Sequence, residues 1–296
     1  MKIAPVSAGS PENGVASRLN ISPNGVEWLT VPAWGSQDWL WHGFSTRRGG
    51  VTSAYLFGLE SAEGGLDELN LGFTAADTPE NVRENRQRFV EAITGSRKTP
   101  LETVRQVHSS LSVVLPGDRA TASGAVSEAD GIITAEPGLL LGIQTADCIP
   151  VLVADPVKRA VGAFHAGWRG TVERIVESGI ARMRAEFGSD PADMMAAIGP
   201  GIGPCCYTVG AEVRTQFATR FSYADELFIR REEDLRLNLM EANRRQLLAA
   251  GLAENAIAMV GGCTGCQQEL FFSHRTSGGH AGRMMAGIGI RPRLTP

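Results

Sequence analysis

Short apolar runs rich in Val and Ile alternate with amphipathic helical segments from residue 26 to residue 290. Several of these runs are apolar at successive positions, so both faces of the strands that they predict would be buried. A strand buried on both faces belongs to a sheet that is covered on both sides. We therefore expect an α/β fold, a single layered domain with mixed sheets flanked by helices. The predicted strands cover residues 102–107, 111–115, 130–134, 139–144, 149–154, 160–165, 194–198, 256–260 and 284–290.

Three segments have the apolar spacing of helices, and they cover residues 79–94, 170–187 and 235–250. The first has the clearest start, because Thr78 stands at the cap position and Pro79 in the first turn. We expect residues 1–25, which contain scattered Pro, Ser and Gly, to form a flexible lead-in. Residues 26–296 are then expected to form one domain.

The charge pattern excludes several classes of partner. Lys and Arg number 28 against 32 Asp and Glu, for a net charge of −4, and no long block of like charge marks a nucleic-acid-binding surface. The most apolar stretch, residues 138–154, is interrupted by polar side chains and cannot span a membrane. The first residues lack the apolar core of a secretory signal, so we expect a cytoplasmic protein. We also expect a small-molecule substrate, and a monomer or weak dimer.

Five cysteines are an odd number in a long chain, which disfavours a disulfide framework and favours thiolate or metal chemistry. Three candidate ligands, His108, Cys148 and His165, stand at the ends of predicted strands, where α/β folds assemble sites from distant segments. If they converge, two imidazoles and a thiolate suit zinc and leave a fourth position open. Taken alone, Cys148 next to an apolar strand is better explained as an ordinary core residue.

Two basic turns could bind an anion. In FSTRRGGVT, residues 44–52, two arginines stand beside paired glycines, and the alternative is a hairpin with solvated arginines. In AGWRGT, which follows His165, Arg169 precedes a helix, and the alternative is an ordinary strand-to-helix turn. The Gly-Pro segment IGPGIGPCCYTVG, residues 198–210, matches no nucleotide-binding fingerprint.

A second metal site is conceivable near the C-terminus. Cys263 and Cys266 form a CxxC pair that is followed by His274 and His280, in the pattern C-x2-C-x7-H-x5-H. The gap between the pairs is shorter than in the usual zinc finger. We therefore expect free thiols beside a Gly-rich turn rather than a structural zinc ion.

Seven collinear segments between about residue 39 and residue 290 resemble the laccase-domain family. Its members were called multicopper polyphenol oxidases and are now described as broad-specificity purine nucleoside phosphorylases. The resemblance implies a laccase-type α/β domain with a layered fold similar to the catalytic domain of cytotoxic necrotizing factor. The segments are FSTRRGGVT at 44, LNLGFTAADTPENVRENR at 69, VRQVHSS at 104, ADGIITAEPGLLLGIQTADCIPVLVAD at 129, GAFHAGWRGTVERIV at 162, AAIGPGIGPCCYTVG at 196 and LFFSHR at 270.

The resemblance implies roles for particular residues. The three candidate ligands would hold one zinc ion and act in catalysis, and four further residues would bind phosphate or substrate: Arg47, Asn70, Arg169 and Arg275. The family continues the FFSHR segment with a second Arg and an Asp, whereas this chain has TSGGHAGR. Substrate contacts from that loop are therefore not carried over, although Arg275 itself matches.

The activity implied by the resemblance is zinc-dependent phosphorolysis of adenosine, inosine, guanosine and methylthioadenosine, with inorganic phosphate as co-substrate. The arginines would position phosphate for attack on the ribose. Adenosine deamination is a second implied activity, in which zinc activates water. Known zinc deaminases carry a Glu two residues after a ligand His, and none follows His108 or His165 here.

Three other functions compete with this one. A four-copper oxidase needs about ten histidines and the chain has five, which disfavours a copper-dependent polyphenol oxidase, although copper could replace zinc at a single site. Cys148 could instead be the nucleophile of a hydrolase or amidase acting on cell-wall peptide precursors, with His165 or His108 as its base. The chain could also bind metal or a partner without turnover.

Overall fold

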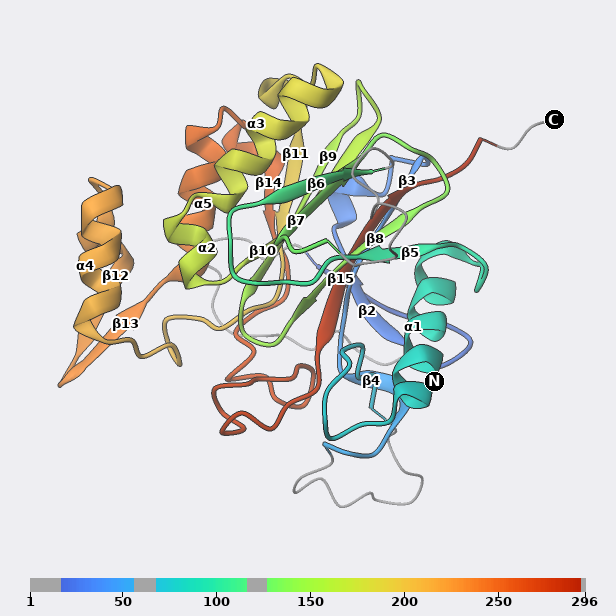
Figure 1. Cartoon of the computed structure of the whole chain (residues 1–296), viewed down its shortest axis with the longest axis horizontal. Helices are drawn as coiled ribbons and strands as arrows, with labels where there is room; N and C mark the ends of the chain where they lie inside the picture. The colour runs from blue at the N-terminus through green and yellow to red at the C-terminus, as the bar shows by residue number, and fades with distance from the viewer. Residues whose placement is uncertain (1–16, 56–67, 116–126, 294–296) are drawn as a thin grey trace.

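A computed structural model describes residues 17–55, 68–115 and 127–293. Two six-stranded sheets pack face to face, and helices cover the outer face of each sheet (Figure 1). The layers are therefore helix, sheet, sheet and helices. The predicted class, an α/β fold with mixed sheets flanked by helices, is confirmed, while the likeness to cytotoxic necrotizing factor stays a prediction. No helix in the described ranges is long and apolar enough to cross a membrane.

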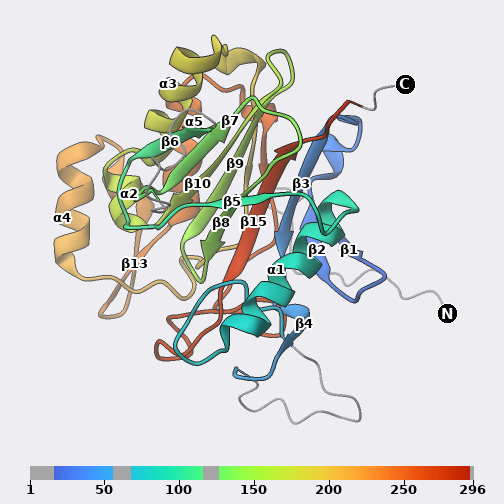
Figure 2. The same ribbon diagram turned by 45° about the vertical axis from the view of Figure 1, so that its right-hand side comes forward.

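The first sheet joins strands from both ends of the chain. The last strand, β15, lies between β3 and β8 (Figure 2). All neighbours in this sheet are antiparallel except β5 and β8, which are parallel. In sheet order the strands are β1 (Arg18–Ile21), β2 (Glu27–Thr30), β3 (Leu40–Ser45), β15 (Met284–Ile290), β8 (Leu140–Thr145) and β5 (Leu101–Thr103).

The second sheet supplies the strands that carry the candidate ligands. Its central strands are buried on both faces: in β9, Leu152 faces the layer between the sheets while Val151 and Val153 face the helices. This double burial explains the continuous apolar runs in the sequence. In sheet order the strands are β14 (Ile257–Met259), β11 (Met195–Ile198), β9 (Ile149–Asp155), β10 (Ala160–Ala166), β7 (Gly131–Thr134) and β6 (Ser112–Leu115).

Helix α1 (Pro79–Thr94) covers the first sheet beside β4 (Arg48–Thr52), and its bounds are those predicted from the sequence. The Thr78 hydroxyl accepts a hydrogen bond from the Asn81 N–H, and Gly95 ends the helix in the left-handed conformation. The other helices lie on the side of the second sheet, with a hairpin beside α4 (Figure 1). These elements are α2 (Trp168–Val172), α3 (Ile175–Phe187), α4 (Ala211–Arg220), β12 (Phe228–Arg231), β13 (Asp234–Leu237) and α5 (Leu239–Ala249).

Four sequence-based boundaries need correction. The strand predicted over 102–107 is β5, which ends at Thr103. The helix predicted over 170–187 is two helices, because Arg174 adopts a left-handed φ of 62° between them. The start of the segment 235–250 is strand β13, and the helix begins only after Asn238, whose side chain caps it. Strand β1 lies within the expected lead-in 1–25, and the rest of that lead-in up to residue 16 lies outside the described residues. An exposed edge strand such as β1 has no buried face to leave a pattern in the sequence.

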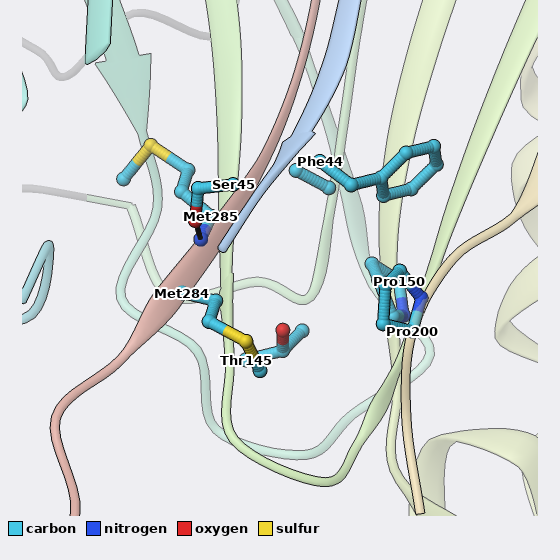
Figure 3. A pocket seen from close by; sticks show the side chains of 8 residues that line it. Phe44, Ser45, Thr145, Pro150, Pro200, Met284 and Met285 are labelled. Carbon is cyan, nitrogen blue, oxygen red and sulfur yellow. Dashed lines mark hydrogen bonds between the residues drawn. The ribbon is translucent and has the colours of Figure 1, made fainter. Parts of the chain in front are cut away.

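Side chains fill the seam between the two sheets. Phe44 of β3, Met284 of β15 and Pro150 of β9 meet there, and the space between them has no room for a water molecule (Figure 3). The Met285 N–H donates to the Ser45 hydroxyl at 2.9 Å across the neighbouring strands β15 and β3. This part of the sheet interface is therefore packed core rather than a ligand cavity, and candidate ligands have to be sought at the ends of the strands.

Candidate active site

His108, Cys148 and His165 come together at one end of the second sheet. His165 lies on β10, and Cys148 stands just before β9, whose Ile149 pairs with Ala166 beside it. His108 comes from the loop after β5. The three potential ligand atoms all lie within 4.8 Å of one another. The predicted convergence of these distant residues is therefore found in the structure.

A buried carboxylate that the sequence analysis missed, Asp130, holds the imidazole of His165 and the backbone of His108. Asp130 Oδ1 accepts hydrogen bonds from Nδ1 of His165 at 2.8 Å and from the backbone N–H of His108 at 3.0 Å. Its Oδ2 accepts from the N–H and hydroxyl of Ser109 at 2.6 and 2.9 Å. Because Nδ1 of His165 is used in this way, its Nε2 is left to bind a ligand. A fully buried Asp at the start of an apolar run was the available signal, since buried charges need partners.

The backbone around the three residues is tightly constrained. His108 has a left-handed φ of 61°, which a non-glycine residue adopts only when its surroundings fix it. A Cβ atom on Gly167 would lie 2.9 Å from Cδ2 of His108 and 3.0 Å from Sγ of Cys148. Glycine is therefore required at 167 for the chain to pass so close to both side chains.

Charges within the group favour ionised forms. Burial by itself raises the pKa of the Cys148 thiol, but His165 and His108 lower it to about 6. Burial by itself lowers the pKa of His165, but the Cys148 thiolate and the Asp130 carboxylate raise it to about 9. Without a metal, the group at neutral pH is a thiolate beside an imidazolium.

The donor set fits zinc. Two imidazole nitrogens and one thiolate sulfur are typical zinc ligands, and a carboxylate hydrogen-bonded to a ligand histidine is the usual support of such a site. Three protein ligands leave one coordination position for water or substrate, as in catalytic rather than structural zinc sites. The arrangement can therefore serve as a metal centre for chemistry.

Asp147, next to Cys148, gathers the loops that surround the site. Its carboxylate accepts hydrogen bonds from the Thr264 hydroxyl at 2.6 Å and from the Arg275 N–H at 2.7 Å. Its backbone carbonyl accepts from the Ile202 N–H at 2.8 Å. Asp147 is buried and has a left-handed φ of 86°. Three loops thus meet at the residue that precedes the candidate thiolate ligand.

Two of the predicted phosphate-binding residues have exposed guanidinium groups on this side. Arg169 stacks on the Trp168 ring at 4.4 Å. Arg275 lies over the Tyr207 ring at 5.1 Å and donates to the Thr208 carbonyl at 2.6 Å. Burial and the Cys148 thiolate raise the pKa of Tyr207 to about 12, and the charges of Arg275 and Arg169 oppose that rise. The charges of both arginines and of the candidate thiolate therefore all affect the pKa of Tyr207.

The basic turn after His165 leads into a short helix, and the binding of an anion by Arg169 or by the start of this helix stays a prediction. Helix α2 has only five residues, and Arg174 interrupts the chain before α3 begins.

The guanidinium group of Arg47 forms hydrogen bonds within the protein. Its guanidinium donates two hydrogen bonds to Oε1 of Glu68, one to the Gln268 carbonyl and one to the Tyr55 carbonyl. It also stacks on the Phe272 ring at 4.6 Å. Four of the five N–H groups of an arginine are therefore used, and at most one remains for a phosphate.

Asn70 is also occupied. It is fully buried, and its amide donates to the Gly72 carbonyl and to Asp77. Its carbonyl oxygen accepts from the N–H groups of Gly72 and Arg283. Asn70 therefore organises its own loop in this structure, and its contact with substrate stays a prediction.

The two cysteines and the two histidines of the C-terminal segment do not form one cluster. His280 contacts the Ala54 carbonyl at 3.2 Å and stacks near Tyr55, beside a pocket of about 320 Å³ that Arg47 also lines. Among the residues that the structure describes, Cys263 and Cys266 belong to a group of possible metal ligands that contains neither His274 nor His280. The zinc-finger-like pattern of the sequence is therefore not formed.

Residues 41–291 match the family described as multi-copper polyphenol oxidoreductase laccase. The chain belongs to this family. It is 36% identical over 263 residues to a Geobacillus stearothermophilus protein named purine nucleoside phosphorylase YlmD, with 86% of this chain and 91% of that protein covered. It is 38% identical over 252 residues to a Deinococcus radiodurans protein named purine nucleoside phosphorylase, with 85% and 90% covered. The resemblance inferred from the seven segments is confirmed.

The solved structures of the family agree with the fold. The crystal structure of the Bacillus licheniformis hypothetical protein YfiH has a TM-score of 0.76 and 35% identity to this chain. The matched region covers 89% of this chain and 96% of the solved chain. The names of the relatives support an enzyme, and the group of His108, Cys148 and His165 gives this family member a candidate metal centre.

Proposed function

We propose that this chain is a zinc-dependent purine nucleoside phosphorylase that acts on adenosine, inosine, guanosine and methylthioadenosine, with inorganic phosphate as co-substrate. The observation that carries the proposal is the convergence of His108, Cys148 and His165 within 4.8 Å. Arg169 and Arg275 are exposed, and their charges act on Tyr207, as does the Cys148 thiolate. The names of the relatives, purine nucleoside phosphorylases, support this substrate class.

The residues of the chain divide the work. The three ligands would hold the zinc ion, which when bound supplies a Lewis acid with one open coordination position. Asp130 fixes the tautomer and orientation of His165 by accepting from its Nδ1. Arg169 and Arg275 offer N–H groups that can pair with phosphate oxygens. Phosphorolysis depends mainly on positioning and charge stabilisation, which this arrangement of fixed ligands and exposed cations can provide.

A second candidate function rests on the same three side chains. Cys148, His165 and Asp130 also stand in the order of nucleophile, base and orienting carboxylate, and the lowered pKa of Cys148 makes it a thiolate at neutral pH. A hydrolase or amidase that forms a covalent intermediate on Cys148 would use this arrangement without metal. The relatives' names favour the phosphorylase.

Adenosine deamination, the second activity that the family resemblance implies, has less support than phosphorolysis. Serine and glycine, rather than glutamate, stand two residues after His108 and His165. An assay of adenosine with and without phosphate separates the activities, because phosphorolysis releases adenine only with phosphate and deamination yields inosine in either case.

Arg169→Ala and Arg275→Ala are each expected to raise the KM for phosphate about tenfold or more, because a hydrogen bond from a charged group contributes about 1.5–3 kcal/mol. Steady-state phosphorolysis of inosine at varied phosphate measures the effect. Arg83→Ala is the matched control, since Arg83 is an exposed residue of α1, the helix that covers the first sheet, and pairs with Glu80 of the same helix. An unchanged KM for phosphate in both site variants would contradict the assigned roles.

Asp130→Asn is expected to weaken zinc binding about 10–100-fold, because the carboxylate that orients the ligand histidine is lost. Competition titration with a fluorescent zinc chelator measures the affinity. Ser109→Ala is the control, because it removes one hydrogen bond to Asp130 but leaves the carboxylate on His165. Equal zinc affinity in Asp130→Asn and the wild type would show that Asp130 does not support a metal site.

A further inference from the structure

Four of the five cysteines converge outside the candidate active site. Two come from the Gly-Pro segment that follows β11, and two from the CxxC pair that follows β14. Their sulfur atoms all lie within 4.8 Å of one another, and all four thiols are free. The four-cysteine cluster consists of Cys205, Cys206, Cys263 and Cys266.

The two loops are shaped so that these thiols can meet. A Cβ atom on Gly265 would lie 2.9 Å from Cβ and 3.0 Å from Sγ of Cys206. A Cβ atom on Gly203 would lie 3.2 Å from both Sγ of Cys205 and Cβ of Cys263. Glycine at these two positions leaves the room that the converging side chains occupy. Gly203 belongs to the Gly-Pro segment 198–210, which the sequence analysis could assign to no nucleotide-binding motif.

The spacing of the sulfur atoms suits a tetrahedral ion. Sγ of Cys266 lies 3.3 Å from Sγ of Cys205 and 3.4 Å from Sγ of Cys206. In a tetrahedral site with zinc–sulfur bonds of about 2.3 Å, the sulfur atoms stand about 3.8 Å apart. The N–H of Gly203 donates to Sγ of Cys263 at 3.1 Å, the kind of outer contact that supports a thiolate ligand.

A disulfide accounts for this arrangement less well. A disulfide joins two sulfur atoms at about 2.05 Å and leaves no role for a third or fourth. Here Cys266 is nearly equidistant from Cys205 and Cys206, so neither pair is singled out. Four thiols around one point are instead the donor set of a structural zinc site.

We propose that the four-cysteine cluster binds a structural zinc ion, in addition to the metal centre of His108, Cys148 and His165. Four protein ligands close the coordination sphere, so this ion would take no part in chemistry. This proposal does not rest on the proposed function. It replaces the sequence-based expectation of free thiols, because the partners of the CxxC pair come from 60 residues upstream rather than from the nearby histidines.

The bound ion would stabilise the loops beside the active site. Thr264, between the two cysteines of the CxxC pair, donates to the Asp147 carboxylate, and so does the Arg275 N–H farther along the same loop. Tyr207 directly follows Cys206 and packs under the Arg275 guanidinium. A zinc ion that joins the two loops would therefore fix Tyr207 and Arg275 relative to Cys148.

The zinc content of purified protein tests the proposal without reference to activity. We expect two zinc ions per wild-type chain, one in Cys148→Ser, one in Cys266→Ser and none in the double variant. His280→Ala should keep two, because this histidine is not in the cluster. In Cys148→Ser the remaining ion belongs to the cluster, and its removal by a chelator should lower the melting temperature, since structural zinc contributes folding free energy.

Alkylation of the wild-type protein provides a second measurement if Cys266→Ser fails to fold. Peptide mapping after iodoacetamide treatment should find the four cluster cysteines unmodified in the metal-bound protein and all modified after chelation, because a bound thiolate is shielded. The proposal is overturned by a single zinc per chain that Cys148→Ser removes and Cys266→Ser retains. Alkylation of the cluster cysteines in zinc-loaded protein, or a native mass that shows a disulfide among them, would also overturn it.

Discussion

Removal of zinc is expected to abolish nucleoside phosphorolysis and to expose Cys148 to alkylation in the same step. A metal ligand shields its thiolate, and the pKa of Cys148, about 6 without metal, leaves a reactive thiolate at neutral pH once the metal is gone. Activity with inosine and phosphate, zinc content and modification of the Cys148 peptide are measured on the same chelated samples. Added zinc should restore activity to samples that were not alkylated.

The same experiment decides between the two candidate functions. A Cys-His hydrolase would keep its activity in metal-free protein, lose it on alkylation and form a covalent intermediate on Cys148. Chelation would also remove zinc from the four-cysteine cluster. Cys266→Ser is therefore the matched variant, because it lacks a ligand of that cluster and retains the active-site ligands. Its activity should still require zinc. Full phosphorolysis in metal-free protein would contradict a role for zinc in the reaction.

Local signals made parts of the fold predictable. Helix α1 was predicted with its observed bounds because its cap, its proline and its apolar face all lie within one short segment. Strands β9 and β10 were recognisable because burial on both faces leaves continuous apolar runs. The exposed strand β1 and the hairpin of β12 and β13 leave no such run, and the sequence analysis missed them together with β2, β3 and β4.

Strand pairing was not predictable from the sequence. Strand β15 lies between β3 and β8 through ladders that join Ala286 to Phe44 and to Ile143, residues far away in the chain. Backbone hydrogen bonds form these ladders, and they are nearly independent of side-chain identity. An apolar run therefore indicates that a strand exists but not which strand lies beside it.

In the candidate site, too, local signals were predictable and contacts between distant residues were not. Strand ends and the family resemblance pointed to His108, Cys148 and His165, but Asp130 was missed because its partners lie 22 and 35 residues away. The four-cysteine cluster was missed for a similar reason. The sequence pairs Cys263 and Cys266 with the nearest histidines, whereas the folded loops bring them to Cys205 and Cys206.

Arg47 is a case in which the structure changes the expected consequence of a substitution. The sequence suggested a phosphate ligand, but the guanidinium pairs with Glu68, and the side chains are 13% and 4% exposed. Burial raises the pKa of Glu68, and the charge of Arg47 opposes that rise. The guanidinium also joins the carbonyls of Tyr55 and Gln268, so it connects three segments of the chain.

Arg47→Ala is therefore expected to lower the free energy of unfolding by about 3–5 kcal/mol at neutral pH, because it leaves a buried carboxylate without its partner. Urea unfolding measures the loss. Without Arg47 the pKa of Glu68 in the folded state rises further, and the carboxyl is neutral below that pKa. The stability deficit should therefore shrink as the pH falls through the raised pKa and grow as the pH rises.

Glu68→Gln in the Arg47→Ala background is the matched control, and it should remove this pH dependence and restore part of the stability. A wild-type unfolding curve for Arg47→Ala, together with a raised KM for phosphate, would instead return Arg47 to the role of phosphate ligand.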